Sequence, residues 1–226
     1  LPQAAADALG RPGGDGFGLA AVGTDVLHEV VRNMRNDIIK YGGEVRFNTK
    51  LTDIFTKNGK VCAIEVNDNE TIETDVVVLA LGHSARDTFS MLQKRQLQME
   101  QKPFAIGLRI EHKAAMINEA QYGEAAKQLK AADYKLTHKA ENGRNVYSFC
   151  MCPGGSVVAA TSLKEHVVVN GMSNYARDLE NANSALLVNV LDSDLENDLF
   201  AGIRFQEKYE KLAYDVSKNY FAPCQT

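Results

Sequence analysis

Three features that the 226-residue sequence lacks narrow the classes of protein it can belong to. It has no apolar run near the roughly 20 residues that a helix needs to cross a bilayer. Its start has no basic stretch followed by an apolar one, as a secretory signal would have. The formal net charge is −4, so there is no overall positive field to attract nucleic-acid phosphates. The sequence therefore predicts a cytoplasmic protein that binds neither membrane nor nucleic acid.

Cysteine is also scarce, because Cys62, Cys150, Cys152 and Cys224 are too few for a disulfide framework. The C-x-C spacing of Cys150 and Cys152 differs from the C-x2-4-C of structural zinc, and the histidines form no H-x3-5-H pair. We therefore expect reduced thiols and no metal site. In an alternating strand Cys150 and Cys152 point the same way, which favours small core residues, with a redox pair as the alternative.

What is present is an ordinary globular composition, with 45% apolar and 24% charged residues. Residues 1–22 show no helical or strand periodicity and are expected to be a linker or poorly matched lead-in. Their glycines, Gly13, Gly14 and Gly16, follow no apolar strand, so they do not fit a phosphate-binding dinucleotide loop.

Residues 23–99 have the pattern of half an α/β nucleotide-binding domain. Apolar spacing predicts a helix that is capped by Thr24 or Asp25 and ends at Tyr41-Gly42-Gly43. Short strands are expected at 44–48, 51–55 and 61–66, the last two joined by an Asn58-Gly59 hairpin turn. The apolar run Val76–Leu81 before Gly82 predicts a strand buried on both faces of a parallel sheet. A helix is expected over 85–98.

Residues 100–226 read as an α+β part with many strands. Strands are expected at 104–111, 134–137, 146–150, 156–161 and 166–170, a short helix or loop at 122–132, and helices at 193–200 and 203–215. The predicted fold class is therefore α/β plus α+β.

The end of the predicted parallel strand carries the most chemical information. Ligands bind outside the carboxyl ends of such strands, and Gly82 would let backbone approach a phosphate or ring. Ser84 and Arg86 follow at a helix N-terminus, where anions bind, although a helix cap and a solvated side chain explain them equally well. The sequence has no G-x-S-x-G, H-E-x-x-H or P-loop motif, which disfavours simple hydrolases and NTPases.

Two further segments, Asn170–Ser173 and Asn181–Ser184, are dense in short amides and hydroxyls, with Arg177 between them. Such side chains either form hydrogen bonds with the backbone of their own loop or line a polar site, and the first interpretation is favoured. The turn Pro153-Gly154-Gly155 would expose backbone N–H groups, which also suits a ligand contact.

Several long strings of the sequence resemble the uncharacterised FAD-dependent dehydrogenases (NAD(FAD)-utilizing dehydrogenases) of bacteria. They are VLALGHSARDTF at 78–89, KPFAIGLRIEH at 102–112, YSFCMCPGG at 147–155, NGMS at 170–173, ARD at 176–178 and NANSAL at 181–186. The resemblance covers roughly residues 23–225. It implies an FAD-dependent oxidoreductase of unknown substrate, built from a Rossmann-like FAD domain with an inserted substrate domain.

Against that family pattern, we expect this chain to be an internal piece of the parent protein. It has no strand followed by G-x-G-x-x-G and no returning C-terminal glycine-rich segment. The resemblance thus implies a partial FAD-binding domain at 23–99 and an inserted substrate domain at 100–226. We expect FAD to be the cofactor of the parent protein, and this piece alone to bind FAD weakly or not at all and to have no activity. The expected substrate is a small molecule, and NAD(P)H is a candidate second substrate. The alternative is a non-catalytic ligand- or partner-binding domain with a vestigial flavin half.

The resemblance also implies site residues, although no catalytic acid or base can be named. The expected cofactor contacts are Thr49, Lys50, Leu51, Ala80, Leu81, Gly82, His83, Ser84 and Arg86. The candidate substrate-facing residues are Cys150, Cys152, Gly154, Gly155, Asn170, Gly171, Met172, Ser173, Arg177 and Asn183. His83 and Arg177 are the first residues to mutate.

Overall fold

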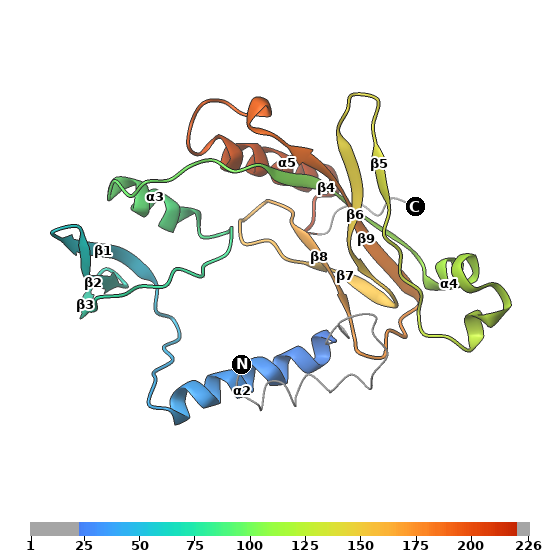
Figure 1. Cartoon of the computed structure of the whole chain (residues 1–226), viewed down its shortest axis with the longest axis horizontal. Helices are drawn as coiled ribbons and strands as arrows, with labels where there is room; N and C mark the ends of the chain where they lie inside the picture. The colour runs from blue at the N-terminus through green and yellow to red at the C-terminus, as the bar shows by residue number, and fades with distance from the viewer. Residues whose placement is uncertain (1–22, 221–226) are drawn as a thin grey trace.

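The computed structural model describes residues 23–220, which form helices and three separate antiparallel sheets (Figure 1). The segment predicted as a lead-in, residues 1–22, lies outside the described residues, as does the C-terminal end from residue 221. None of the helices between residues 23 and 220 is long and apolar enough to span a membrane.

The first helix, α2 (Thr24–Lys40), confirms the helix predicted from apolar spacing. It ends where expected, since Gly42 adopts a φ of +87°, a left-handed conformation that glycine takes without steric cost. However, none of its residues is buried, and Val31, Met34 and Ile39 are each more than half exposed. The apolar face of α2 therefore has no covering partner among residues 23–220.

The start of α2 differs from the prediction because Gly23 is its N-cap. The Thr24 hydroxyl donates instead to the carbonyl of Ser173, at 3.3 Å, and Asp25 Oδ1 accepts from the backbone N–H of Tyr175, at 3.0 Å. These two side chains tie the helix to a segment about 150 residues later in the chain.

A three-stranded sheet follows α2, in the order β1 (Leu51–Lys57), β2 (Lys60–Val66) and β3 (Glu70–Glu73). Asn58 and Gly59 both have positive φ, at 53° and 74°, which is the conformation of a type I′ hairpin turn. The predicted hairpin is thus confirmed. Helix α3 (Arg86–Lys94) is shorter than the predicted 85–98 and lies against β1, where Arg95 at its end forms an ion pair with Asp53.

Two predicted strands are wrong. Residues 44–48 form no strand, and the run Val76–Gly82 is an extended segment paired with nothing in the described chain. Val76 is 74% and Val78 84% exposed, the opposite of burial on both faces. A central parallel strand needs a neighbour on each edge for its N–H and C=O groups, and no described residues form a ladder with this run. The expected Rossmann-like parallel sheet is therefore not seen in residues 23–220.

The second part of the chain is organised around a four-stranded antiparallel sheet in the order β4-β9-β6-β5. Its strands are β4 (Phe104–Lys113), β9 (Asn181–Val190), β6 (Asn145–Cys152) and β5 (Thr137–Lys139). β4 and β9 pair without a break, from Phe104 opposite Val190 to Lys113 opposite Asn181. β4 runs directly into α4 (Ala114–Tyr122), which is followed by the 3-10 turn η1 (Gly123–Lys127). The sequence predicted a short helix or loop at 122–132, which includes η1, but did not predict α4.

A two-stranded hairpin, β7 (Gly155–Ala159) and β8 (Val169–Ser173), lies against this sheet and contacts β6 and β9 (Figure 1). The segments Asn170–Ser173 and Asn181–Ser184, expected as loops, are therefore strand residues of β8 and β9. The predicted helix at 193–200 is reduced to the turn η2 (Asp192–Asp194). The helix predicted at 203–215 is confirmed as α5 (Ala201–Ser217), where Phe205 stacks edge-on against Phe104 of β4.

In the second part of the chain, strand β9 places polar side chains in the buried core. Ala182, Asn183, Ser184 and Ala185 are the consecutive buried residues of β9, and both Asn183 and Ser184 are 0% exposed. Buried amides and hydroxyls are retained in a core only where they are hydrogen-bonded or carry a function. The partners of these two side chains therefore define where a functional site should be sought.

Candidate functional site

A polar cluster, here called the arginine cluster, joins the half-buried Arg109 of β4 and Gly171 of β8 to the buried Cys152 of β6 and Asn183 of β9. Arg109 Nη1 donates to Asn183 Oδ1 at 2.6 Å and to the carbonyl of Cys150 at 3.2 Å. A side chain at Gly171 would collide with the Arg109 guanidinium and the Asn183 amide and lie 2.7 Å from Cys152 Sγ. The cluster is thus packed to contact, and glycine at 171 allows that packing.

The amide of Asn183 is only half satisfied. Its Nδ2 is buried and has no hydrogen-bond partner among the described residues. An unpaired buried donor costs about 1–3 kcal/mol, so such a group calls for a water, a ligand or a functional reason. Arg109 and Asn183 therefore place a cation and an amide donor where β4, β6, β8 and β9 meet.

Cys150 has a strained backbone at the end of β6. Its φ is +49°, in the left-handed region that a residue with a side chain rarely adopts. The pairing of β6 with β9 shifts register between Phe149 and Cys152, so Cys150 sits in a bulge. Its thiol is exposed whereas that of Cys152 is buried. Burial, followed by the neighbouring Cys150 thiol, raises the pKa of the Cys152 thiol.

The turn after Cys152 is anchored by backbone contacts. Gly154 has a φ of +47°, and a side chain there would strike the carbonyl of Arg177. The Ser173 hydroxyl donates to the carbonyl of Pro153 at 2.8 Å, and the N–H of Leu179 donates to that of Gly154 at 3.3 Å. The Gly-Gly turn and the Arg177 segment are therefore neighbours, held together mainly through main-chain groups.

The opposite face of β4 and β9 carries a second polar group. His112 Nε2 and the Tyr134 hydroxyl are joined by a hydrogen bond of 2.9 Å, and their rings lie 5.6 Å apart. Burial raises the pKa of Tyr134, while a hydrogen bond with Ser184 lowers it to a smaller extent. A tyrosine held protonated beside a histidine can hold or pass a proton, which makes the pair a candidate acid–base unit.

The structure brings together most of the predicted substrate-facing residues. Cys150, Cys152, Gly171 and Asn183 meet in or beside the arginine cluster, and Gly154, Gly155, Ser173 and Arg177 form the adjoining turn. Asn170 and Met172 instead have exposed side chains on β8. Their roles stay predictions, because position alone does not show what they bind.

Sequence reasoning missed Arg109, His112, Tyr134 and Ser184 as site residues. The signal for Arg109 and His112 was present, since a cation and a histidine interrupt the apolar alternation of β4. Tyr134 and Ser184 had no such signal, because their partners are 22 and about 50 residues away.

Two of the predicted cofactor segments also approach each other. An ion pair of 2.6 Å between Lys50 Nζ and Asp87 links the start of β1 to the first turn of α3. Thr49 donates its hydroxyl to the carbonyl of Phe47, and Leu51 begins β1. The segment Ala80–Gly82 is exposed, and the space beside Gly82 is open.

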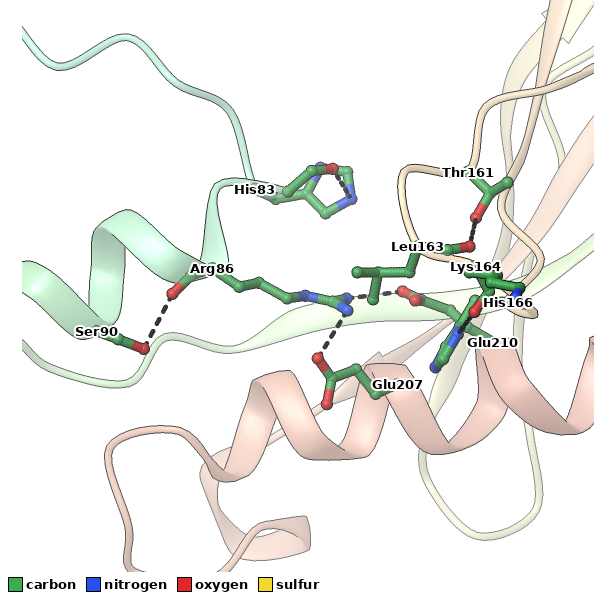
Figure 2. Close-up of polar contacts among 10 residues, drawn as sticks. His83, Arg86, Ser90, Thr161, Leu163, Lys164, His166, Glu207 and Glu210 are labelled. Carbon is green, nitrogen blue, oxygen red and sulfur yellow. Dashed lines mark hydrogen bonds and ion pairs between the residues drawn. The ribbon is translucent and has the colours of Figure 1, made fainter. Parts of the chain in front are cut away.

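Arg86 has taken other partners. Its guanidinium donates to Glu207 at 2.9 Å and to Glu210 at 3.0 Å, both on α5, as Figure 2 shows. His83 and Ser84 lie beside each other just before α3, with their side chains 3.5 Å apart. With two carboxylates against one guanidinium, Arg86 presents no net positive charge to an anion.

A flavin dinucleotide does not fit the described residues as a complete site. Its pyrophosphate needs a glycine-rich turn between a strand and a helix, and residues 23–220 include no such turn beside a parallel strand. Arg86, the predicted cation, is neutralised by Glu207 and Glu210. Residues 23–220 contain no group of three or more His, Cys, Asp or Glu side chains placed to hold a metal ion.

Comparison with known proteins shows the family to which this chain belongs. Residues 103–226 match the family model described as "FAD-dependent protein, C-terminal domain-like", so the chain belongs to that family. It is similar to an uncharacterised protein of Clostridium beijerinckii (strain ATCC 51743 / NCIMB 8052), with 51% identity over 211 residues. That alignment covers 91% of this chain and 39% of the relative. The resemblance to FAD-dependent proteins is thus confirmed at the level of the family.

Proposed function

We propose that this chain is the substrate-side part of an FAD-dependent oxidoreductase, a dehydrogenase whose flavin site is completed by polypeptide outside the described residues. The observation that carries the proposal is the family match over residues 103–226, the part that contains the arginine cluster. In such a protein the flavin would supply the redox chemistry, and the protein would supply position and electrostatics.

The exposed apolar surfaces support a larger assembly. The face of α2 and the run Val76–Gly82 expose Val31, Met34, Val76 and Val78 by more than half of their surface. Monomeric proteins rarely leave such surfaces uncovered. The relative is much longer than the matched region, which covers 39% of it. We therefore propose that the remainder of the full-length protein covers these surfaces and supplies the edge partners that Val76–Gly82 needs to become a strand.

Within this proposal the turn Pro153–Gly155 faces the substrate, and the arginine cluster holds it in place. Arg109 bonds the carbonyl of Cys150, three residues before Pro153, and Gly171 allows β8 to approach. Arg109 is then a positioning residue. The substrate would be a small molecule, with NADH or NADPH as a candidate electron donor.

The test uses the full-length protein that contains this chain, purified and examined for flavin absorbance. We expect a yellow protein whose flavin is bleached by NADH or NADPH, and an isolated chain that binds FAD no more tightly than about millimolar. A colourless full-length protein that takes up no added FAD would contradict the proposal and favour the non-catalytic binding domain. Micromolar binding by the isolated chain would show that the flavin site is complete without further polypeptide.

The role of Arg109 is tested by Arg109→Met in the full-length protein, with Arg46→Met as the control. Arg46 lies outside the cluster and forms an ion pair of 2.5 Å with Glu70 of β3. We expect Arg109→Met to retain flavin absorbance but to change the KM for the electron acceptor or donor, with Arg46→Met unchanged in both. Equal kinetics in the two variants would refute a positioning role.

A further inference from the structure

We propose that Arg109 binds the carboxylate group of a small monocarboxylate through the free edge of its guanidinium, formed by Nε and Nη2. The inference deepens the proposed function, because it names the chemical class of the substrate, and it rests on that function only where it calls the ligand a substrate. The observations behind it are the contacts of Arg109, which hold Nη1 and leave the rest of the guanidinium without partners among residues 23–220.

Arg109 carries a positive charge that no described side chain neutralises. The two groups that accept from its Nη1, the Asn183 amide oxygen at 2.6 Å and the Cys150 carbonyl at 3.2 Å, are both neutral. No carboxylate between residues 23 and 220 forms an ion pair with Arg109, whereas five other arginines each have one, namely Arg46, Arg86, Arg95, Arg144 and Arg204. Because a guanidinium stays protonated, this half-buried cation lacks a counter-ion in the described chain.

The free edge of Arg109 has the donor geometry that a carboxylate requires. Nε and Nη2 donate to no group of the described chain, and neither is among its buried unpaired atoms. The N–H groups along this edge of a guanidinium are parallel, so they pair with the two oxygens of one carboxylate in a bidentate contact. A carbonyl or hydroxyl group offers a single oxygen and no charge, and it therefore satisfies this edge less well.

The guanidinium is also fixed before a ligand arrives. Asn183, which holds Nη1, is 0% exposed and lies on β9, the strand paired with β4. A side chain at Gly171 would come within 2.3 Å of Nη1, so β8 packs against that same nitrogen. A side chain that is already ordered loses less conformational freedom on binding. This anchoring distinguishes Arg109 from an arginine that moves freely in solvent.

The charge of the arginine cluster favours a monocarboxylate over phosphate. One guanidinium balances one negative charge, and the other members of the cluster, Cys152, Gly171 and Asn183, supply no second cation. The other unpaired donor of the cluster, Asn183 Nδ2, is neutral and buried. A phosphate group carries more than one negative charge at neutral pH, so part of its charge would stay uncompensated.

The experiment follows the nitrogen-15-labelled chain by NMR while chloride is replaced by acetate at constant ionic strength, which keeps charge screening unchanged. The signals recorded are the Arg109 Nε–H resonance, identified by its absence in Arg109→Met, and the backbone amides of β4 and β9. We expect a saturable shift with a dissociation constant of about millimolar. Propionate and butyrate should act in the same way, and acetamide and inorganic phosphate should bind at least about tenfold more weakly.

Two results of this titration would overturn the proposal. The first is the lack of a saturable shift with all three monocarboxylates. The second is binding of acetamide or phosphate as tight as that of acetate, because the first would show that charge is unimportant and the second that the site does not select a single carboxylate.

Substitutions of arginine locate the site. Arg109→Met should abolish the acetate shift of the backbone amides. Arg35→Met is the matched control, since Arg35 is also half-buried and has no ion pair in the described chain, but it lies over the Phe47 ring and has no amide anchor. Arg109→Lys keeps the charge without the two-donor edge and should bind acetate about tenfold more weakly. Acetate binding that is unchanged in Arg109→Met or in Arg109→Lys would refute the assignment.

A substitution at Asn183 tests the charge of the cluster. Asn183→Asp places a carboxylate beside Arg109 and should weaken acetate binding at least about tenfold. Asn189→Asp adds the same charge on the same face of β9, six residues later, and should leave the affinity within about twofold. Equal affinity in the two variants, with backbone amide spectra that show both folded, would contradict the proposal. If Asn183→Asp does not fold, the two Arg109 variants decide the question.

None of these measurements depends on a flavin. Acetate binding at Arg109, together with a full-length protein that takes up no FAD, would contradict the proposed function and support this site as a binding site alone. A full-length flavoprotein whose chain shows no acetate binding would refute only the site.

Discussion

Replacing Arg86 by methionine should destabilise the fold more than the loss of any exposed arginine. The Arg86 and Glu210 side chains are each 14% exposed and Glu207 is 38% exposed. Arg86→Met leaves two carboxylates facing each other without their cation (Figure 2). A hydrogen bond to a charged group contributes about 1.5–3 kcal/mol, and the more solvated Glu207 contributes at the lower end. We therefore expect a loss of about 3 kcal/mol in the free energy of unfolding.

The assay is urea denaturation followed by circular dichroism, with Arg204→Met as the matched control. Arg204 also bridges two carboxylates, Glu196 and Asp198, but on the surface, with side-chain exposures of 50%, 83% and 51%. Exposed pairs contribute little to stability, so Arg204→Met should unfold close to the unchanged protein.

A second variant separates the charge effect from lost packing. Adding Glu207→Gln and Glu210→Gln to Arg86→Met removes the unpaired negative charges, and we expect recovery of roughly half the lost stability. The reasoning is refuted if Arg86→Met costs no more than Arg204→Met, or if the triple variant is no more stable than Arg86→Met alone.

Three further predictions concern other parts of the structure. Gly171→Ala should lower the free energy of unfolding, measured by urea denaturation, by about 1–3 kcal/mol, because the added methyl group collides with the arginine cluster. A hydrogen bond from Arg144, and to a smaller extent one from a backbone N–H, lowers the pKa of Asp194 from 3.8 to about 2. The folded state should therefore lose stability as the pH falls from about 4 towards 2. Asp194→Asn should reduce this dependence of the free energy of unfolding on pH. Tyr134→Phe should cost about 1 kcal/mol in urea denaturation, because it removes the hydrogen bond with His112.

Each of these has a control or an opposing result. Gly202→Ala, in α5, meets the Phe104 ring at 3.2 Å and Leu195 Cδ1 at 3.7 Å, and it should stay within about 1 kcal/mol of the parent. The sign for Asp194 follows from its pKa, which is lower folded than unfolded, so its stabilisation is complete above the unfolded pKa. A stability curve unchanged by Asp194→Asn below pH 4 would contradict that assignment. For Tyr134, titration of the tyrosines by ultraviolet absorbance should show one group above the ordinary value of 10, absent in Tyr134→Phe.

Local signals in the sequence predicted several elements correctly. The Asn58-Gly59 turn forms because both residues accept positive φ at little cost, and α2 and α5 follow the spacing of their apolar residues. The same apolar run that predicted a buried strand at Val76–Gly82 gave a wrong result. A strand is defined by the chains on either side of it, and apolar content alone cannot supply them.

The candidate site was predicted in part. Asn183, Cys150, Cys152 and Gly171 were chosen from short polar strings and a turn, and the structure brings them together. Arg109 was missed, although it holds two of the four. Its role depends on the pairing of β4 with β9, which joins residues more than 70 positions apart.

The sequence by itself determined the family resemblance, the hairpin of β1 and β2, and the helices α2 and α5, because these depend on contiguous residues. Only the tertiary structure decided that Asn183 and Ser184 lie at the buried centre of a sheet, that Cys150 is held in a left-handed bulge, and that Arg86 binds two glutamates of α5. Burial and ion pairing are properties of neighbours in space, and those neighbours come from distant parts of the chain.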